Sequence, residues 1–183
     1  MNQRFLQAIL ARRPDLGVSD NYFFFQPPGD ILCGFVPEKG RSIQRIWSFA
    51  VPLYDHLDFL HLGFGKIVPV DAGFLRSEPP VAAAETFLQV IARHEAKARS
   101  YVDPRNFLRM ARAGGKLRNP WAKRAVATTL AFLGEPGEAS RWLGDLEKSQ
   151  AFMEHVPHWV SDLRDLREAF DAGKKSTADL LGR

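Results

Sequence analysis

The stretch that decides the fold begins with Tyr22-Phe23-Phe24-Phe25 and continues to Val68. Within it, aromatic and β-branched residues gather in four short runs, at residues 22–25, 31–36, 43–54 and 58–68. Such runs are typical of β-strands, because these side chains suit a pleated and half-buried surface. The short turns between consecutive runs predict antiparallel pairing. The sequence therefore predicts an antiparallel β-meander of about four strands.

The turn residues support this assignment. Residues 26–30, Gln-Pro-Pro-Gly-Asp, cannot continue a strand, because proline lacks the N–H donor and Gly-Asp favours a turn. This segment is predicted to be the loop of a hairpin. In the third run Trp47, Phe49 and Val51 share one face, and Pro52 is expected to end the strand or to lie at an edge.

After Pro79 the pattern changes to alanine, leucine and charged residues at helical spacing. Helices are expected over residues 81–101, from 104, from 120 to 133, over 138–148 and over 157–172, besides a short one near residues 5–10. Asp103-Pro104 and Asn119-Pro120 each combine a favoured N-cap with a proline at the first helical position. The predicted fold class is α+β. Residues 1–78 hold an N-terminal helix and the sheet, and residues 79–183 form antiparallel helices that pack on the sheet as one compact unit.

Composition sets further bounds on the protein. The chain has 183 residues, of which 45% are hydrophobic, and this is enough for a core without a metal or disulfide staple. Its one cysteine, Cys33, falls in an apolar run, and we expect it to be a small buried side chain. No segment has the length of a membrane span or the features of a signal peptide. We therefore expect a cytoplasmic protein with no cofactor and no membrane partner.

Two resemblances follow from local motifs. Residues 21–66 contain Tyr22-Phe23-Phe24-Phe25-Gln26-Pro27, Cys33-Gly34-Phe35, Trp47-Ser48-Phe49, Pro52-Leu53-Tyr54 and Leu62-Gly63-Phe64-Gly65-Lys66. This succession resembles bacterial proteins known only as domains of unknown function, which implies a similar sheet and no particular activity. Residues 125–143, with Leu133-Gly134 and Glu138-Ala139, resemble a single tetratricopeptide-type helical hairpin. No second copy occurs at the 34-residue period, so an ordinary hairpin is favoured over a repeat array.

Catalytic and metal-binding motifs are incomplete in this sequence. His94-Glu95 lacks a second histidine four residues after the first, and neither Gly-Lys pair has the spacing of a phosphate-binding loop. His155 and His158, with Asp162 one turn later, are the nearest approach to metal-ligand spacing, and we predict no metal there. His56 and His61 flank a hairpin with Asp55, Asp58 and Lys66, where an acid–base site is the alternative to solvated turn residues.

Charge is distributed unevenly along the chain. Residues 96–134 carry nine basic side chains against the single acid Asp103, whereas residues 135–171 carry nine acids against four basic residues. Arginines at positions 105, 109 and 112 are spaced i, i+4 and i+7, so they share one face of a helix. The residues predicted to contact a partner are Arg105, Arg109, Arg112, Lys116, Arg118, Lys123 and Arg124.

The sequence leaves three functional classes open. The first is a non-catalytic, protein-binding or regulatory protein whose basic helical surface meets an acidic partner. The second is a nucleic-acid binder that uses the basic region from Lys97 to Arg124. The third is an enzyme with an unfamiliar site near His56, His61 and Lys66. A bland alternative for the basic region is internal pairing with acids of the C-terminal helix, namely Asp162, Asp165 and Glu168.

Overall fold

The structure is a computed structural model, and it describes residues 2–39, 44–55, 64–69, 79–113 and 119–148, together with 165, 167 and 168. The chain divides into two compact units. The first unit comprises residues 1–51 and 64–103, and the second comprises residues 52–63 and 104–183. The sequence pattern changes at residue 79, yet the helix that follows belongs to the first unit. Each unit therefore combines two separate segments of the chain.

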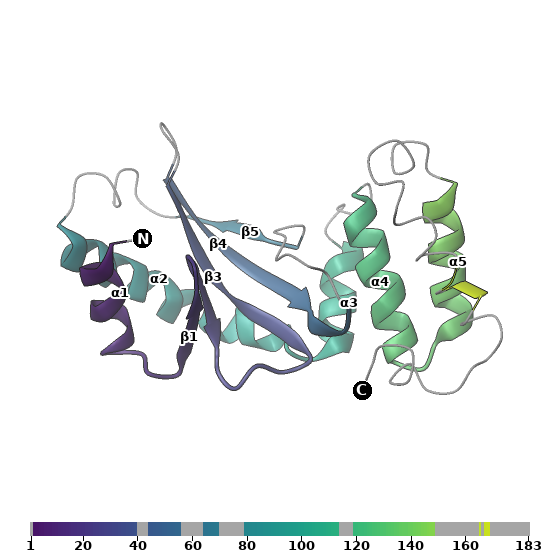
Figure 1. Ribbon diagram of the computed structural model, residues 1–183, viewed down its shortest axis with the longest axis horizontal. Coiled ribbons are helices and arrows are strands. Elements are labelled where there is room, and N and C mark those ends of the chain that lie inside the picture. The colour runs from purple at the N-terminus through teal and green to yellow at the C-terminus, as the bar shows by residue number, and fades with distance from the viewer. Residues whose placement is uncertain are drawn as a thin grey trace. The chain divides into compact units, whose positions relative to one another are not determined.

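The first unit contains a five-stranded antiparallel sheet, with the strands in chain order (Figure 1). The predicted α+β class and the antiparallel meander are confirmed, with one strand more than expected. The strands are β1 (Leu16–Ser19), β2 (Tyr22–Phe25), β3 (Ile31–Lys39), β4 (Gln44–Pro52) and β5 (Lys66–Val68).

The additional strand, β1, carries no aromatic residue, and its sequence Leu-Gly-Val-Ser gave no strand signal. It pairs with β2 so that Ser19 lies opposite Tyr22, which leaves a turn of two residues, Asp20 and Asn21. Asp20 has a φ of 53°, a left-handed conformation that the tight turns of two-residue hairpins require. Strand β1 thus forms because it pairs with the aromatic strand β2, and its four residues alone are too few to predict a strand.

Strands β4 and β5 agree only in part with the predicted runs. Strand β4 ends at Pro52, as expected for a residue that cannot donate to the next rung. The predicted strand at 58–68 is observed over Lys66–Val68, and residues 58–63 lie outside the described part of the chain. Register places Ile46 opposite Val68, and both side chains are buried.

The core of the first unit lies between the sheet and two helices, α1 (Gln3–Leu10) and α2 (Pro80–Ser100) (Figure 1). Three phenylalanine rings meet there. The centroid of the Phe23 ring on β2 lies 5.0 Å from that of Phe87 on α2 and 6.2 Å from that of Phe5 on α1. All three are at most 5% exposed. Burial of the apolar face of α2 against α1 and the sheet assigns this helix to the first unit.

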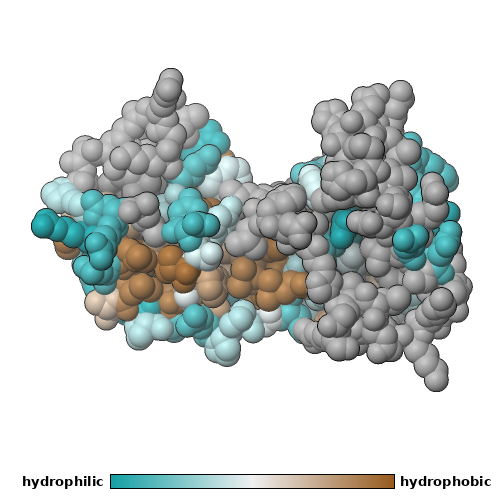
Figure 2. Space-filling view, in the orientation of Figure 1, coloured by the Kyte–Doolittle hydropathy of each residue, from teal (hydrophilic) through white to brown (hydrophobic). Residues whose placement is uncertain are grey.

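The opposite face of the sheet is also hydrophobic. Because side chains alternate along a strand, Tyr22 and Phe24 point away from the buried ring of Phe23. The Tyr22 ring packs edge-on against that of Phe49, at 5.4 Å between centroids. Figure 2 shows a band of hydrophobic residues across the first unit, bordered by hydrophilic ones. The sheet therefore carries apolar side chains on both faces.

The second unit contains a short 3-10 helix, η1 (Leu53–Asp55), and the helices α3 (Pro104–Ala113), α4 (Pro120–Phe132) and α5 (Pro136–Glu147). Their starts follow the predicted cap residues. The Asn119 side chain accepts a hydrogen bond from the backbone N–H of Trp121 at 2.9 Å. Helix α4 ends at Phe132, and Gly134, two residues later, has a φ of 82°. The N–H of Glu135 then donates to the carbonyl of Leu130 at 2.9 Å, which completes a glycine C-terminal motif.

Helices α4 and α5 form the helical hairpin that the sequence predicts between residues 120 and 148. Small side chains make a close approach possible, since Ala127, Ala131 and Ala139 are completely buried. Of the fifth predicted helix, at 157–172, only residues 165, 167 and 168 are described, and all three are helical. The rest of that segment lies outside the described residues.

Candidate functional site

Helix α3 presents the arginine row that the sequence predicts. Its apolar side is fixed by Phe107, Leu108 and Ala111, which are buried. Arg105, Arg109 and Arg112 are exposed. With a rise of about 1.5 Å per residue, the row extends for about 10 Å along the helix. No acidic residue occurs in α3, so the row is a purely basic strip on a rigid element. We call these three residues the arginine row.

The other predicted partner-binding residues are distributed differently. Lys123 lies on α4 and is partly exposed. Arg124, its neighbour, is buried and does not extend the exposed basic surface. Lys116 and Arg118 lie outside the described residues. Among the described positions, the exposed basic surface of α3 thus reduces to the arginine row, with Lys123 on the next helix.

Arg124 forms a buried ion pair instead. Its Nε lies 2.9 Å from Oδ1 of Asp55, and its Nη2 donates to the backbone carbonyl of the same residue at 3.2 Å. The Asp55 side chain is 0% exposed and that of Arg124 is 9% exposed. Nothing in the local sequence distinguishes Arg124 from the other basic residues between positions 96 and 134, so its burial was not predictable. Asp55 was expected to be a solvated turn residue, and the structure corrects that expectation, because η1 carries its carboxylate onto α4.

A second contact fixes η1 on α4 beside the ion pair. The Tyr54 hydroxyl donates to Oγ1 of Thr129 at 2.8 Å, and its ring stacks on that of Phe132 with centroids 4.4 Å apart. Thr129 donates in turn to the carbonyl of Ala125 at 2.5 Å. These contacts hold Asp55 in place through packing and hydrogen bonds. The arrangement has a structural role, since Asp55 and Arg124 face each other away from solvent.

Of the residues considered for an acid–base site, Asp55 and Lys66 are described by the structure. Asp55 is committed to Arg124, and Lys66 is an exposed residue of β5 in the other unit. His56, Asp58 and His61 lie outside the described residues. The third functional class, an enzyme with a site at these positions, therefore gains no geometric support from the part of the chain that is described.

The arginine row has one acidic neighbour whose ion pair is defined. The Nη2 of Arg112 donates to Oε1 of Glu138, in the first turn of α5. The two side chains are 39% and 33% exposed, so the pair is open to water. Asp165 and Glu168, which the sequence offered as internal partners, are exposed, and neither forms an ion pair with Arg109 or Arg112. Asp162 lies outside the described residues.

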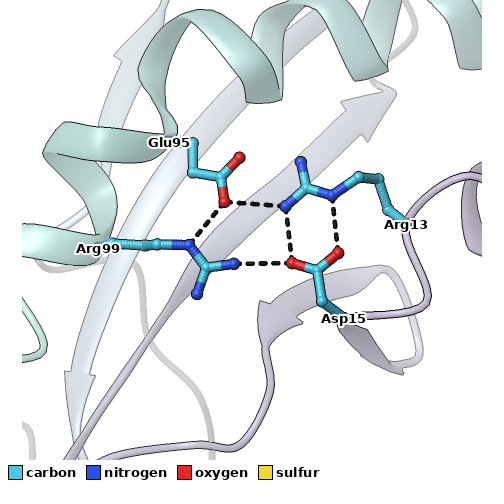
Figure 3. A network of polar contacts seen from close by, with 4 residues as sticks. All are labelled: Arg13, Asp15, Glu95 and Arg99. Atoms are coloured by element: carbon cyan, nitrogen blue, oxygen red, sulfur yellow. Dashed lines mark hydrogen bonds and ion pairs between the residues drawn. The ribbon is translucent and has the colours of Figure 1, made fainter.

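A different charged cluster lies in the first unit, and Figure 3 shows its four residues. Arg13 binds Asp15 with two hydrogen bonds, Nε to Oδ1 at 2.7 Å and Nη2 to Oδ2 at 2.8 Å. Arg99 on α2 donates from Nη2 to Oδ2 of Asp15 at 2.7 Å. Glu95, one turn earlier on α2, accepts from Nη2 of Arg13 at 2.9 Å and from Nε of Arg99 at 2.6 Å. The four side chains close a ring of alternating charge, which we call the ionic ring.

The electrostatics of the ionic ring favour the charged forms. Hydrogen bonds from Arg13 lower the pKa of Asp15, against the smaller opposing effect of burial. Burial alone would raise the pKa of Glu95, but hydrogen bonds from Arg99 and Arg13 and their charges lower it. The pKa of Arg13 is raised, chiefly by the hydrogen bond to Asp15. Each of the two cations is paired with both anions. The ring therefore has the chemistry of a stabilising ion-pair network and not of an acid–base catalyst.

The guanidinium of Arg99 also lies over an aromatic ring. Its central carbon is 4.0 Å from the centroid of Phe25, within the range of a cation–π contact. Arg99 therefore contacts three parts of the first unit: Asp15 after α1, Phe25 on β2 and Glu95 on its own helix, α2. The ring was not predictable from local patterns, because the contacts that join Arg13 to Glu95 and Asp15 to Arg99 span 82 and 84 positions of the chain.

Cys33 does not behave as a reactive thiol in this structure. It is 2% exposed, and burial raises its pKa to about 12. At neutral pH the side chain is a protonated thiol, and thiolate is the nucleophilic form. The prediction of a small buried side chain is confirmed.

Metal-binding side chains are not clustered in the part of the chain that the structure describes. Within that part of the chain, no group of three or more His, Cys, Asp or Glu side chains could hold an ion. His155 and His158, the predicted nearest approach to a metal site, lie outside it. The described helices also include none with the length and apolarity that crossing a bilayer requires.

Comparisons with known proteins add no relative to this picture. The chain matches no family model, no curated protein and no solved structure. The two resemblances noted in the sequence therefore stay predictions.

Proposed function

We propose that this protein is a non-catalytic binding protein that docks an acidic protein partner on the arginine row of α3. The observation that carries the proposal is the combination of exposure and fixed spacing in Arg105, Arg109 and Arg112. A helix whose other side is anchored by buried Phe107 holds the three guanidinium groups in register. Arginine is also the side chain best suited to bind carboxylates through two parallel hydrogen bonds.

The catalytic alternative has less support among the described residues. The two carboxylates of the ionic ring are each held by two arginines, and Cys33 is protonated and buried. Neither arrangement offers a poised base or nucleophile. The buried pair of Asp55 and Arg124 has a structural role on α4. The exposed basic row on α3 is thus the feature that most needs a functional explanation.

Electrostatics suggests what such a row contributes. A single exposed ion pair is worth roughly 0.2–1 kcal/mol. Three pairs formed together would give modest affinity, and their larger effect is on the rate and orientation of encounter. Binding by this surface should therefore be moderate, reversible and weakened by salt.

The test uses a defined acidic probe. A helical peptide of about 20 residues would carry three glutamates at i, i+4 and i+7 on one face, with a fluorescent label. Its affinity for the full chain would be measured by anisotropy at low salt. Replacing Arg105 and Arg109 with glutamate should weaken binding about tenfold or more, because two attractions become two repulsions. A matched control is Arg141→Glu, at an exposed arginine on α5.

Two further measurements make the result decisive. A scrambled peptide, with the same composition but glutamates on all faces, should bind less tightly than the ordered one. Thermal melts should show that the double variant keeps its fold, since exposed substitutions change stability by less than about 0.5 kcal/mol each. Unchanged affinity combined with a lower melting temperature would refute the proposal and identify the row as an internal ion-pairing surface.

A further inference from the structure

We infer that Glu138 is a built-in competitor for the arginine row, and that the row accepts the carboxylates of an acidic protein segment that displaces it from Arg112. This inference rests on the proposed function and specifies both the ligand chemistry and its regulation. Glu138 already places a carboxylate oxygen on the last guanidinium of the row. It therefore shows in the resting protein which chemical group the row binds.

Several features make Glu138 suited to this role. Its pair with Arg112 is partly exposed on both sides, so the contact can open without uncovering the core. Glu138 lies in the first turn of α5, where the helix dipole stabilises a negative charge. The carboxylate can thus leave Arg112 and remain favourably placed. Its neighbour Ala139, in contrast, is fully buried and holds the turn in position.

The occupancy of Arg112 has a direct consequence for binding. A partner that engages the whole row must first break the internal pair, so its affinity is reduced by the strength of that pair. For an exposed pair this corresponds to a factor of about two to five. Arg109, one turn earlier, carries no such defined pair among the described residues, and we expect the partner to engage it first.

The surroundings favour an acidic protein over a nucleic acid. Single-stranded nucleic acids are usually held by aromatic side chains beside the basic groups. The one aromatic residue of α3, Phe107, is completely buried. Glu138 and the exposed Asp145 also place negative charges on α5, and these would repel a continuous chain of phosphates more than a few discrete carboxylates.

The experiment uses the full chain and the ordered acidic peptide described above. Glu138→Gln should raise the affinity of the chain for the peptide about two- to fivefold, because the neutral amide no longer competes for Arg112. The matched control is Asp145→Asn, which removes an equal charge at an exposed position of the same helix and should have a clearly smaller effect. In an Arg112→Gln background, Glu138→Gln should change the affinity hardly at all. The melting temperature of Glu138→Gln supplies a second readout. Loss of the pair between Arg112 and Glu138 should lower the melting temperature while the affinity for the peptide rises.

Each result has a defined meaning. Equal gains from Glu138→Gln and Asp145→Asn would overturn the inference, because the effect would then be general electrostatics. The proposed function would survive that outcome provided that reversal of Arg105 and Arg109 still weakened binding. Tighter binding of a single-stranded oligonucleotide than of the peptide, with the same dependence on Glu138, would also overturn the choice of an acidic protein. Loss of the Glu138 effect in the Arg112→Gln background, together with a gain in the parent chain, would establish the competition.

Discussion

Replacing Arg124 with methionine isolates the cost of an unpaired buried charge in this protein. The substitution keeps an unbranched apolar stem of similar course, so the packing along α4 changes little. It removes the guanidinium that donates to Oδ1 of Asp55 at 2.9 Å and to the carbonyl of Asp55 at 3.2 Å. The carboxylate of Asp55, which is 0% exposed, would then lose its ionic partner.

The expected magnitude follows from burial. An ion pair in water contributes at most about 1 kcal/mol, whereas breaking a buried pair from one side costs about 3–5 kcal/mol. With exposures of 0% and 9%, the pair of Asp55 and Arg124 belongs to the second class. A loss of that size is a large part of the 5–15 kcal/mol that typically stabilises a folded domain. Adding Asp55→Asn should recover part of the loss, because it removes the stranded charge.

Urea denaturation monitored by tryptophan fluorescence would measure these changes. Trp121 on α4 and Trp142 on α5 report on the second unit, which contains the pair. The control is Arg112→Gln, which breaks the exposed pair with Glu138 and should cost less than about 1 kcal/mol. A loss below about 1 kcal/mol for Arg124→Met, or no recovery in the double variant, would refute the assignment of a buried pair that holds η1 on α4.

Three other predictions concern the first unit and the hairpin of the second. The lowered pKa of Asp15 lies below its ordinary value of 3.8, so the stability that it contributes is present above that value and is lost as the pH falls through the folded pKa. Melting curves between pH 7 and 3 should therefore show Asp15→Asn less stable than the parent at neutral pH, with the two converging in acid; parallel curves would contradict this. Gly17→Ala should cost about 1–3 kcal/mol in urea titrations, because a Cβ there would lie 2.3 Å from the Phe24 ring. Gly137→Ala meets no atom within 4 Å and should instead stabilise α5 by about 0.4–1 kcal/mol, and the same sign for both would disprove the packing argument. Cys33, with a pKa of about 12, should react with a disulfide reagent on the order of a hundredfold more slowly in the native protein than in urea, and similar rates would rule out its burial.

The fold was predictable where local chemistry determines it. The aromatic run Tyr22–Phe25 and the proline-rich loop after it predict the hairpin to β3, and capping residues such as Asn119 locate the helix starts. Strand β1 was missed because it depends on pairing with β2 and has little propensity of its own. The division of the helices between two units was not predictable, since hydrophobic spacing shows that a helix has a buried face but not what covers it.

The candidate site shows the same limits. The row of Arg105, Arg109 and Arg112 was predictable, because residue spacing alone places side chains on one face of a helix. The burial of Arg124 was not, since its partner Asp55 is 69 positions away. Likewise the ionic ring joins Asp15 to Arg99, a pairing that only the tertiary fold creates. Local patterns predict the helix face on which a charged side chain lies. Contacts between distant parts of the chain decide whether that side chain forms an ion pair within the protein.

The interleaved course of the chain has a consequence for its synthesis. The first unit includes residues 64–103, and its ionic ring requires α2, so it cannot be completed when the first 51 residues have left the ribosome. The second unit likewise begins at residue 52 and awaits residues beyond 104. Neither unit can therefore fold as an uninterrupted nascent segment, and contacts across such long separations slow folding. Ribosome-bound chains truncated near residue 60 should accordingly remain open to protease, whereas chains extended well past residue 103 should protect the sheet.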